Sequence, residues 1–283
     1  MTDRAVLSVD FELFSQTPAY RNASGDTVEA GLGLDASEYL RSALAEREAT
    51  ATFFVVSSVA ERYPEVVESF AAAGHEIASH THSHKLLSSL SAADRREEVR
   101  RSKRVLERVT GRPVDGFRAP AFDRPDDLFD ELADAGYAYD SSVAPSRHIP
   151  GWYGGDHDVH RPVPATNVRA NAPAGVDELP VSVMPGVRLP LTGAWLRFFG
   201  PRYTVYGMKQ LARRGVTPVL YVHPWELVDL PPVEGVPKRV YWHTGAWMRR
   251  AVDRVLAQPF EFVTARSVVE SAADSEARER RAA

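Results

Sequence analysis

The feature that most constrains the fold of this chain is a repeated alternation of two kinds of segment. Short apolar runs rich in β-branched residues, the pattern of buried strands, are followed by stretches with apolar residues at helical spacing. Consecutive parallel strands need a long crossover connection, which is usually a helix. The alternation therefore predicts an α/β protein in which helices cover a parallel sheet, either open or closed as a barrel.

The expected elements fall into one domain, residues 1–272, followed by a charged tail, 273–283, that frays. Between residues 143 and 203, Gly, Pro and His recur, which predicts a long loop region with short strands such as "DELPVSVM". The expected strands cover 5–9, 51–56, 75–79, 114–117, 137–142, 218–222 and 260–265, and the expected helices cover 35–48, 60–74, 91–111, 125–136, 204–215 and 244–257.

Composition narrows the possible functions. The chain has 34 Lys plus Arg and 38 Asp plus Glu, a formal charge of −4, which gives no electrostatic reason to expect a nucleic-acid partner. It has no cysteine, so imidazole and carboxylate groups must hold any metal. The N-terminal apolar run is short and interrupted by acids, and no other run approaches the ~18 residues of a membrane span. We therefore expect a soluble cytoplasmic protein without a transmembrane segment.

Residues suited to catalysis stand at the carboxyl ends of four separate predicted strands. In parallel α/β folds these ends form one shared rim, where active sites are built. The four segments should therefore converge on one mouth. Asp10 and Glu12 follow the strand at 5–9, His80 and His84 the strand at 75–79, Arg118 the strand at 114–117, and His223 the strand at 218–222.

Two of these segments point to a metal site. Side chains alternate across an extended strand, so Asp10 and Glu12 in "SVDFE" share a face, where paired carboxylates favour a cation or a shared proton. His80 and His84 in "HTHSH" are four residues apart, and on a helical turn this spacing presents both rings to one metal. Taken alone, each segment is also explained by solvated acids or by a histidine-rich turn.

The other candidate residues have weaker signals of their own. The forked guanidinium of Arg118 in "GFRAPAF" is suited to orienting a carboxylate, although a lone arginine is usually a surface residue. His223 in "LYVHPWE" ends an apolar strand beside a tryptophan, and a buried structural histidine is the alternative. We expect His82 to point away from the ligand pair, and His75 to be a structural residue.

The segments "SVDFE", "TFFVVSSVAERYPEVVESFAAAGHEIASHTHSH", "GFRAPAF", "YDSS" and "LYVHPWE", in this order, resemble the polysaccharide deacetylase family, also called the NodB-homology family or carbohydrate esterase family 4. The resemblance covers residues 5–263, and "ELPVS", "HPWE" and "YWHTGAW" are similar to a branch associated with exopolysaccharide synthesis. It implies an irregular (β/α) barrel of seven or eight parallel strands. It also implies hydrolysis of N-acetyl groups on N-acetylhexosamine units with a divalent metal, commonly Zn²⁺, with Co²⁺ or Mn²⁺ as alternatives.

The resemblance also implies roles for individual residues. The first motif departs from the family pattern, because many members have two adjacent acids and the second ligates the metal, whereas Phe11 stands here. We therefore assign Glu12 as the third ligand, and an exchange of roles between Asp10 and Glu12 stays open. By motif, Asp10 resembles the general base, His80 and His84 the metal ligands, Arg118 the residue that steers the base, His223 the general acid, the backbone N–H near Ala121 an oxyanion donor, and Asp140 the support of the acid histidine.

Three functions follow as hypotheses. The first is metal-dependent deacetylation of a polysaccharide or its precursor, a carbohydrate partner that bears N-acetyl groups. The second is hydrolysis of a small linear or cyclic amide, as in allantoinase-like barrels, and the third is a carbohydrate-binding barrel without activity. Four aromatic residues are candidates for stacking on sugars, with core packing as the alternative reading: Trp152, Tyr153, Trp225 and Trp242.

Overall fold

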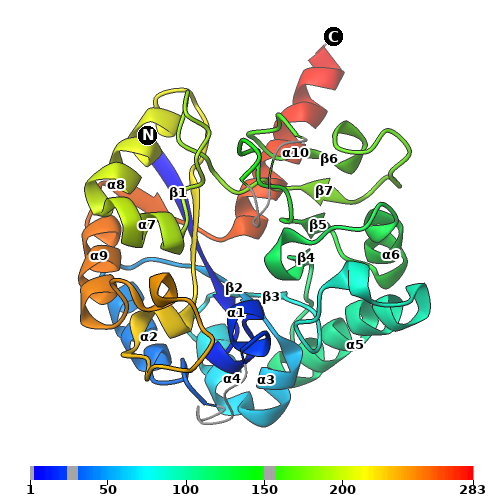
Figure 1. The fold of residues 1–283 in the computed structure, drawn as a ribbon. Helices are drawn as coiled ribbons and strands as arrows, with labels where there is room; N and C mark the ends of the chain where they lie inside the picture. Colours follow the sequence, from blue (N-terminus) through cyan, green and yellow to red (C-terminus); the bar gives the residue numbers. More distant parts are fainter. Residues whose placement is uncertain (1–2, 24–30, 150–153, 155–156, 283) are drawn as a thin grey trace.

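A curled sheet forms the centre of the computed structural model, which describes residues 3–23, 31–149, 154 and 157–282 (Figure 1). Its strands are ordered β6-β7-β5-β4-β3-β2-β1-β8, with β9 also paired to β1. All pairings are parallel except β6 with β7, so β1–β5 and β7–β9 supply eight parallel strands, within the seven or eight expected. The strands are β1 (Asp3–Phe11), β2 (Thr52–Val55), β3 (Glu76–Ser79), β4 (Gly116–Phe117), β5 (Tyr139–Asp140), β6 (Val163–Pro164), β7 (Asp177–Glu178), β8 (Val219–Val222) and β9 (Phe260–Phe262).

The segment that follows β7 connects the two ends of the curled sheet. The backbone N–H of Leu179 donates to the carbonyl of Asp140 on β5 at 2.8 Å. Three residues later, Ser182 N donates to Val219 O at 3.1 Å, and Val219 N donates to Ser182 Oγ at 2.8 Å. Residues 179–182 thus bridge β5 and β8, and the sheet becomes an irregular barrel of the predicted kind.

Helices surround the barrel (Figure 1). Among the described residues, none of them is both long and apolar enough to cross a membrane. The helices are α1 (Pro18–Arg21), α2 (Ala36–Ala45), α3 (Ser57–Arg62), α4 (Pro64–Ala72), α5 (Ala92–Thr110), α6 (Leu128–Ala135), α7 (Gly193–Phe199), α8 (Pro201–Ala212), α9 (Ala246–Leu256) and α10 (Ala265–Ala282), with short 3₁₀ turns that include η1 (Phe14–Gln16), η3 (Pro120–Phe122), η5 (Pro224–Leu227) and η6 (Lys238–Tyr241).

The two faces of β1 show how the sequence pattern positions the site. Leu7 and Val9 belong to the large core cluster between the sheet and the helices. Val6 belongs to a second cluster, which lines the inside of the barrel together with Phe54 of β2. Because side chains alternate along a strand, Ser8 and Asp10 share the face of Val6. Asp10 therefore stands inside the barrel at the carboxyl end of its strand.

Three expected elements differ in the structure. The single helix predicted over 60–74 is two helices, α3 and α4, because Pro64 lacks an N–H and starts a new helix at its first position. The loop region contains α7, which begins after Thr192, whose Oγ1 accepts from the N–H of Trp195 at 3.5 Å. The tail that was expected to fray continues α10 as far as Ala282.

Candidate active site

The two acids of the first motif reach the same region by different routes. Asp10 is the penultimate residue of β1, and the side chain of Phe11 turns to the helix layer, with its ring 5.5 Å from that of Phe70. The backbone then bends, since the N–H of Glu12 donates to the carbonyl of Asp10 at 2.9 Å. Both carboxyl side chains are buried, with 3% of each residue exposed. Both carboxyl groups act on His80 and His223 and so face the same site, although a backbone bend rather than strand alternation brings Glu12 there.

His80 and His84 come together in a loop rather than on a helical turn, which corrects our prediction. Thr81 has a φ of 63° and His84 a φ of 56°, both in the left-handed region, so the segment is not helical. The loop nevertheless brings the two rings to a centroid separation of 4.8 Å. Glu98 of α5 holds it in place by accepting hydrogen bonds from the backbone N–H groups of His82 and Ser83 at 3.0 and 2.8 Å.

The other two histidines of this segment lie outside the cluster, as expected. His82 Nδ1 hydrogen-bonds Ser57 Oγ at 2.9 Å on the opposite side of the loop. The ring of His75 packs near Phe53 and Phe70, with ring centroids 5.5 and 6.3 Å away. Burial lowers the pKa of His75, so the folded protein holds this ring neutral.

Glu12, His80 and His84 form a group suited to binding a metal ion, with potential ligand atoms all within 4.8 Å of one another. His80 Nδ1 lies 2.7 Å from the carbonyl of Arg118, and His84 Nδ1 lies 3.0 Å from the carbonyl of Gln16. A carbonyl oxygen only accepts, so each Nδ1 carries the proton. Each Nε2 then faces the other potential ligands, which is the usual arrangement of metal-binding histidines.

The atoms of this group fit a divalent cation. Glu12 Oε2 lies 2.5 Å from His84 Nε2, and this buried oxygen has no hydrogen-bond donor among the described residues. Two acceptor atoms facing each other need a positive charge or a proton between them. Burial alone would raise the pKa of Glu12, but a proton held between it and His84 Nε2 makes a charged hydrogen bond that, with His223 and His80, lowers the pKa to about 2. Burial also lowers the pKa of His80 to about 4, which favours its ligand form.

Arg118 is a wholly buried cation that holds Asp10. Its Nη1 donates to Asp10 Oδ1 at 2.5 Å and to Ser8 Oγ at 3.0 Å. Its Nε and Nη2 donate to the carbonyl and hydroxyl oxygens of Ser141 at 3.0 and 2.9 Å, and its guanidinium lies 4.0 Å from the ring centre of Phe54. These contacts fix both the arginine and the carboxylate of Asp10, as the orienting role requires.

His223 is oriented by Glu226, a residue that our sequence analysis did not identify. Glu226 Oε2 accepts from the backbone N–H of His223 at 2.9 Å and lies 3.1 Å from its Nδ1, while Oε1 accepts from Arg197 Nε at 2.7 Å. Burial lowers the pKa of His223, but the hydrogen bond and charge of Glu226, with Glu12 and Asp10, raise it to about 9. An acid three residues after His223 in "HPWE" was the available signal.

Asp140 does not support His223, so this prediction is corrected. Its Oδ1 accepts from Ser142 Oγ at 2.5 Å, and its carboxyl group lies next to that of Glu178 on β7. Burial raises the pKa of both acids, and the neighbouring carboxyl group raises that of Glu178 further. Ser142 Oγ in turn accepts from the N–H of Ala119 at 2.8 Å. Through Ser142, Asp140 therefore holds the backbone of the "GFRAPAF" segment, the arginine motif that contains Arg118.

Ala121 lies in η3, in a strained part of the arginine motif. It has a φ of 52°, and the φ of Phe122 is 58°. The left-handed region costs a residue with a side chain roughly 1–2 kcal/mol, and such strain tends to occur at functional sites. Ala121 is exposed, in contrast to Arg118.

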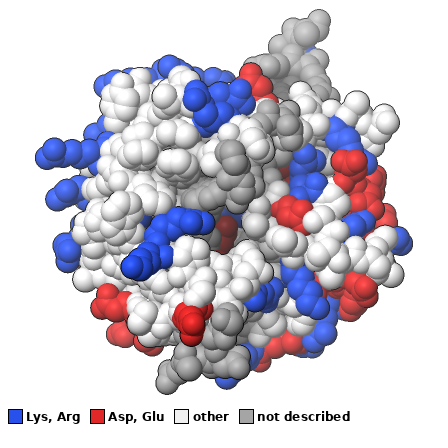
Figure 2. Space-filling model, in the orientation of Figure 1, with Lys and Arg blue, Asp and Glu red and all other residues white. Residues whose placement is uncertain are grey.

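The aromatic candidates divide into different roles. Trp225 is buried, and its Nε1 donates to Glu12 Oε1 at 3.0 Å, so it orients a candidate ligand rather than offering a face to a sugar. Trp242 is 57% exposed. Trp152 and Tyr153 lie outside the described residues. Figure 2 shows a hollow near the centre of this face of the molecule, with an acidic side chain at its floor.

Two family models match the chain one after the other. Residues 27–139 match the model described as Polysaccharide deacetylase, and residues 141–270 match a Domain of unknown function (DUF3473). The second match contains Glu226 and its neighbour His223, whose Nε2 lies 3.7 Å from Oε1 of Glu12, the residue that follows β1. The site is thus assembled from both matched segments and from β1, which precedes them.

Curated proteins match the chain over part of its length. It is 30% identical to a Bacillus cereus peptidoglycan-N-acetylglucosamine deacetylase over 99 residues, 35% of this chain and 34% of that protein. It is 34% identical to a Sinorhizobium fredii chitooligosaccharide deacetylase over 96 residues, 34% of this chain and 45% of that protein. The chain therefore spans less than half the length of either relative.

A solved structure matches the fold over almost the whole chain. The protein, from Mycobacterium smegmatis, carries a provisional polysaccharide deacetylase name. It superposes with a TM-score of 0.65 at 23% identity, over 97% of this chain and 92% of that one. With the family model and both curated relatives in agreement, the segment 27–139 belongs to the polysaccharide deacetylase family, and the whole chain has the barrel fold of that family's NodB type.

Proposed function

We propose that this protein removes acetyl groups from N-acetylhexosamine units of a polysaccharide or of its precursor, releasing acetate and a free amine. One observation carries the proposal: the Glu12, His80 and His84 cluster lies between two polar pairs, Asp10 with Arg118 and His223 with Glu226. The family supplies the reaction class, and the motif "HPWE" supports a substrate in exopolysaccharide synthesis.

Different residues of the chain serve the separate steps of amide hydrolysis: metal binding, activation of water and stabilisation of the oxyanion. A divalent cation held by Glu12, His80 and His84, most simply Zn²⁺, with Co²⁺ or Mn²⁺ as alternatives, would polarise the acetyl carbonyl and acidify water. Asp10, fixed by Arg118, accepts the proton of the attacking water. The backbone N–H near Ala121 donates a hydrogen bond to the oxyanion of the tetrahedral intermediate.

Collapse of that intermediate needs a proton on the leaving nitrogen. His223 supplies it from Nε2. Its Nδ1 faces Glu226, whereas its Nε2 faces the metal-binding group and lies 3.7 Å from Glu12 Oε1. Transfer to the nitrogen breaks the carbon–nitrogen bond and leaves acetate and the amino sugar. The two polar pairs thus handle the two proton transfers beside the metal-binding group.

The test combines metal analysis with acetate release by the purified full-length chain. We expect about one equivalent of bound divalent metal and acetate release from N-acetylglucosamine oligomers, with both lost in His80→Ala and His84→Ala. His82→Ala is the matched control, because this histidine of the same loop points away and should leave metal content unchanged. Acetate release that survives both chelation and His80→Ala would contradict the proposal.

Two other outcomes of the same assays would replace the proposal with an alternative. Hydrolysis of allantoin or another small amide, with no acetate from oligosaccharides, would show a small-amide hydrolase. Binding of oligosaccharides without release of acetate would show a binding barrel. Either result would be compatible with the metal site itself, which the metal analysis reports separately.

A further inference from the structure

One long segment of the chain has a charge balance unlike that of the rest. From Leu179 to Trp225 there are six basic residues and no Asp or Glu, although acids outnumber bases in the whole chain by 38 to 34. This segment contains α7, α8 and β8. Arg202 and Lys209 lie on α8, and Arg213 and Arg214 directly follow it, so four of the six positive charges gather at this helix.

The outer surface of these helices combines basic and large apolar side chains. Phe199 is 52% exposed and Tyr206 is 59% exposed, and both are among the most exposed large apolar residues of the described chain. Arg202 and Arg213 are also exposed and, with Tyr206, recur at helical spacing along α8. We call the surface formed by Phe199, Arg202, Tyr206 and Arg213 the α8 face.

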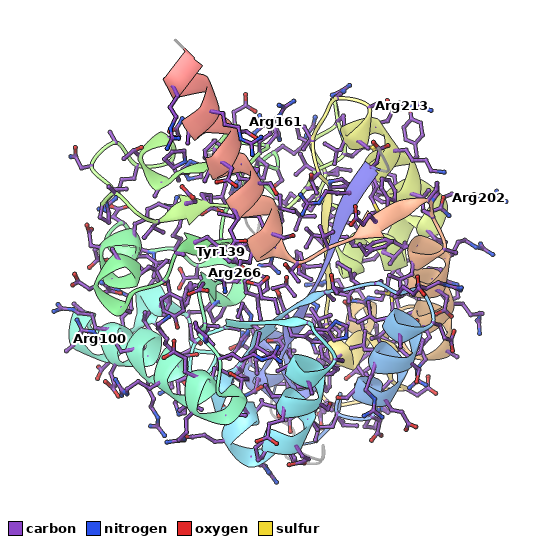
Figure 3. The ribbon with its side chains drawn as sticks, turned by 180° about the vertical axis from the view of Figure 1, so that it is seen from behind. Arg100, Tyr139, Arg161, Arg202, Arg213 and Arg266 are labelled. Carbon is purple, nitrogen blue, oxygen red and sulfur yellow. The ribbon has the colours of Figure 1, made fainter. Side chains whose placement is uncertain are left out.

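The figures place this surface on the outside of the molecule. Arg202 and Arg213 project at the outer edge beside α8 (Figure 3). In Figure 2 the region over α7 and α8 shows basic groups at its edge and no acidic groups, whereas acidic groups gather on the side of α6. The α8 face is therefore a one-sided cationic surface with aromatic side chains between the charges.

The basic residues of α8 also differ from those of α5 in their partners. On α5, Arg104 pairs with Glu97 at 2.8 Å and Arg108 with Glu61 at 3.3 Å. Within the described part of the chain, no acidic group comes within 4.0 Å of Arg202 or Arg213. Cations without an intramolecular partner are free to meet an external anionic surface.

We propose that the α8 face binds the surface of a bilayer containing anionic phospholipids, so that the protein is peripherally attached to a membrane. Interfacial helices of this kind carry Lys or Arg beside aromatic side chains, which enter the headgroup region. Basic side chains near an anionic leaflet each contribute attraction, and their long stems let the charges reach the headgroups. The charge of the surface and its aromatic content match this partner.

The shape of the α8 face favours a bilayer over an anionic polysaccharide. A glycan subsite is usually a concave groove with polar groups that fix hydroxyls. The α8 face is the outer side of α8 and the end of α7, and Arg202 stands between its two aromatic residues (Figure 1). An outer surface of aromatic and basic groups fits a planar, deformable headgroup layer better than a single sugar chain.

Vesicle co-sedimentation of the full chain tests the proposal. We expect binding to phosphatidylcholine vesicles that contain about one third phosphatidylglycerol, little binding to pure phosphatidylcholine, and weakening by salt. Arg202→Gln with Arg213→Gln should lower the partition coefficient roughly 25-fold, at about fivefold per residue. Arg104→Gln with Arg108→Gln removes the same charge from α5 and should leave binding unchanged.

A second pair of variants examines the apolar contribution. Phe199→Ser with Tyr206→Ser should also weaken vesicle binding while circular dichroism shows an intact fold, because both side chains are largely exposed. Equal binding to neutral and anionic vesicles, or an equal loss in the α5 control, would overturn the proposal. So would binding of soluble alginate through Arg202 and Arg213 without binding to vesicles, which would show a polysaccharide surface instead.

Discussion

Glu226 is the residue on which the orientation of His223 depends. Its carboxylate is wholly buried between His223 and Arg197. Glu226→Gln should keep the shape but remove the charge that holds the imidazole, lowering kcat roughly 10²-fold with little change in KM. Steady-state kinetics measure this split, and Glu234→Gln on an exposed part of the same loop is the matched control. A kcat equal to that of the control would show that Glu226 has no positioning role.

The close approach of Gly193 to Glu226 offers an independent check of this assignment. A Cβ added at Gly193 would lie 2.0 Å from Glu226 Oε2, which is closer than real contacts permit. Gly193→Ala must therefore displace the carboxylate without removing it. The same fall in kcat is expected from this change, which leaves both His223 and Glu226 chemically intact.

The Asp140 and Glu178 pair should make stability depend on pH. Burial raises the pKa of both carboxyl groups, so the folded protein retains a proton that the unfolded chain releases. Stability is therefore highest below the ordinary carboxyl pKa and falls as the pH rises towards the folded-state pKa values, by at most about 1.4 kcal/mol per pH unit for each retained proton. Glu178→Gln should flatten this slope in urea unfolding measured across pH, whereas exposed Glu261→Gln should not. An unchanged slope in Glu178→Gln would contradict this account.

Residue types and strand ends were enough to predict which of these groups converge. Asp10, Glu12, His80 and Arg118 each follow an apolar strand, and the shared rim of a parallel sheet brings them together. The helical turn at His84 was wrong because spacing alone does not reveal the positive φ values that the loop adopts. The assignment of Asp140 as the partner of His223 was wrong for a similar reason. Either Asp140 or Glu226 could have this role by residue type, and only the fold shows that Asp140 lies on β5 and Glu226 in η5, directly after His223.

At the scale of elements, a half-buried acid of β3 makes one of the contacts that attach α10 to the barrel, beside the hydrogen bonds of Arg4 with Ser267 and of Ala265 with Thr52. Glu76 of β3 accepts from Tyr139 Oη and Thr52 Oγ1, both at 2.7 Å, and from the N–H of Arg266 at 3.0 Å. Figure 3 shows Tyr139 and Arg266 together near the start of this helix. Glu76 therefore joins three strands to a helix N-terminus, where a carboxylate also interacts well with the helix dipole.

Removing this attachment should destabilise the protein measurably. Glu76→Ala loses three hydrogen bonds and leaves buried donors unsatisfied, so we expect a loss of about 2–4 kcal/mol in the free energy of unfolding. Urea denaturation measures the loss, and hydrogen exchange should show α10 opening first. Glu270→Ala removes an exposed acid of the same helix and should cost less than about 0.5 kcal/mol. Equal effects of the two changes would rule out the attachment.

Elements with long, regular patterns were predictable, and short ones were not. The helix at α5 has a Ser91 cap and a terminal Gly111, and it appears within one residue of its expected bounds. By contrast α7 has only seven residues between Gly- and Pro-rich segments, and tertiary packing rather than its own periodicity makes it helical. The charged residues after 272 continue α10 as far as Ala282, an extension that their charge alone did not predict.

At the scale of the whole molecule, the two matched segments meet inside one sheet. The first ends at Tyr139 and the second begins at residue 141, whereas β5 spans Tyr139–Asp140 and pairs on both sides. Strand β1 pairs with β2 of the first segment and with β8 and β9 of the second. The region matched as a domain of unknown function therefore completes the barrel and supplies His223.

Fragments divided at this point should not fold alone. Residues 1–140 would leave an edge of β1 without β8 and β9, and residues 141–283 would keep only the short pairing of β6 with β7. We expect each fragment to lack cooperative thermal unfolding by circular dichroism, and mixing them to restore it in part. A cooperative transition in either fragment by itself would mean that the two segments are separate folding units.

The pairing of β1 with strands from the far end of the chain also has a consequence for biosynthesis. A ribosome completes β1 and β2 early, but about 160 residues separate Val55 from Val219, which takes on the order of 10–30 s at typical elongation rates. Throughout that interval, the nascent chain presents an apolar strand edge that has no partner. Holdase chaperones should therefore bind the amino-terminal half during translation and release it once β8 has emerged.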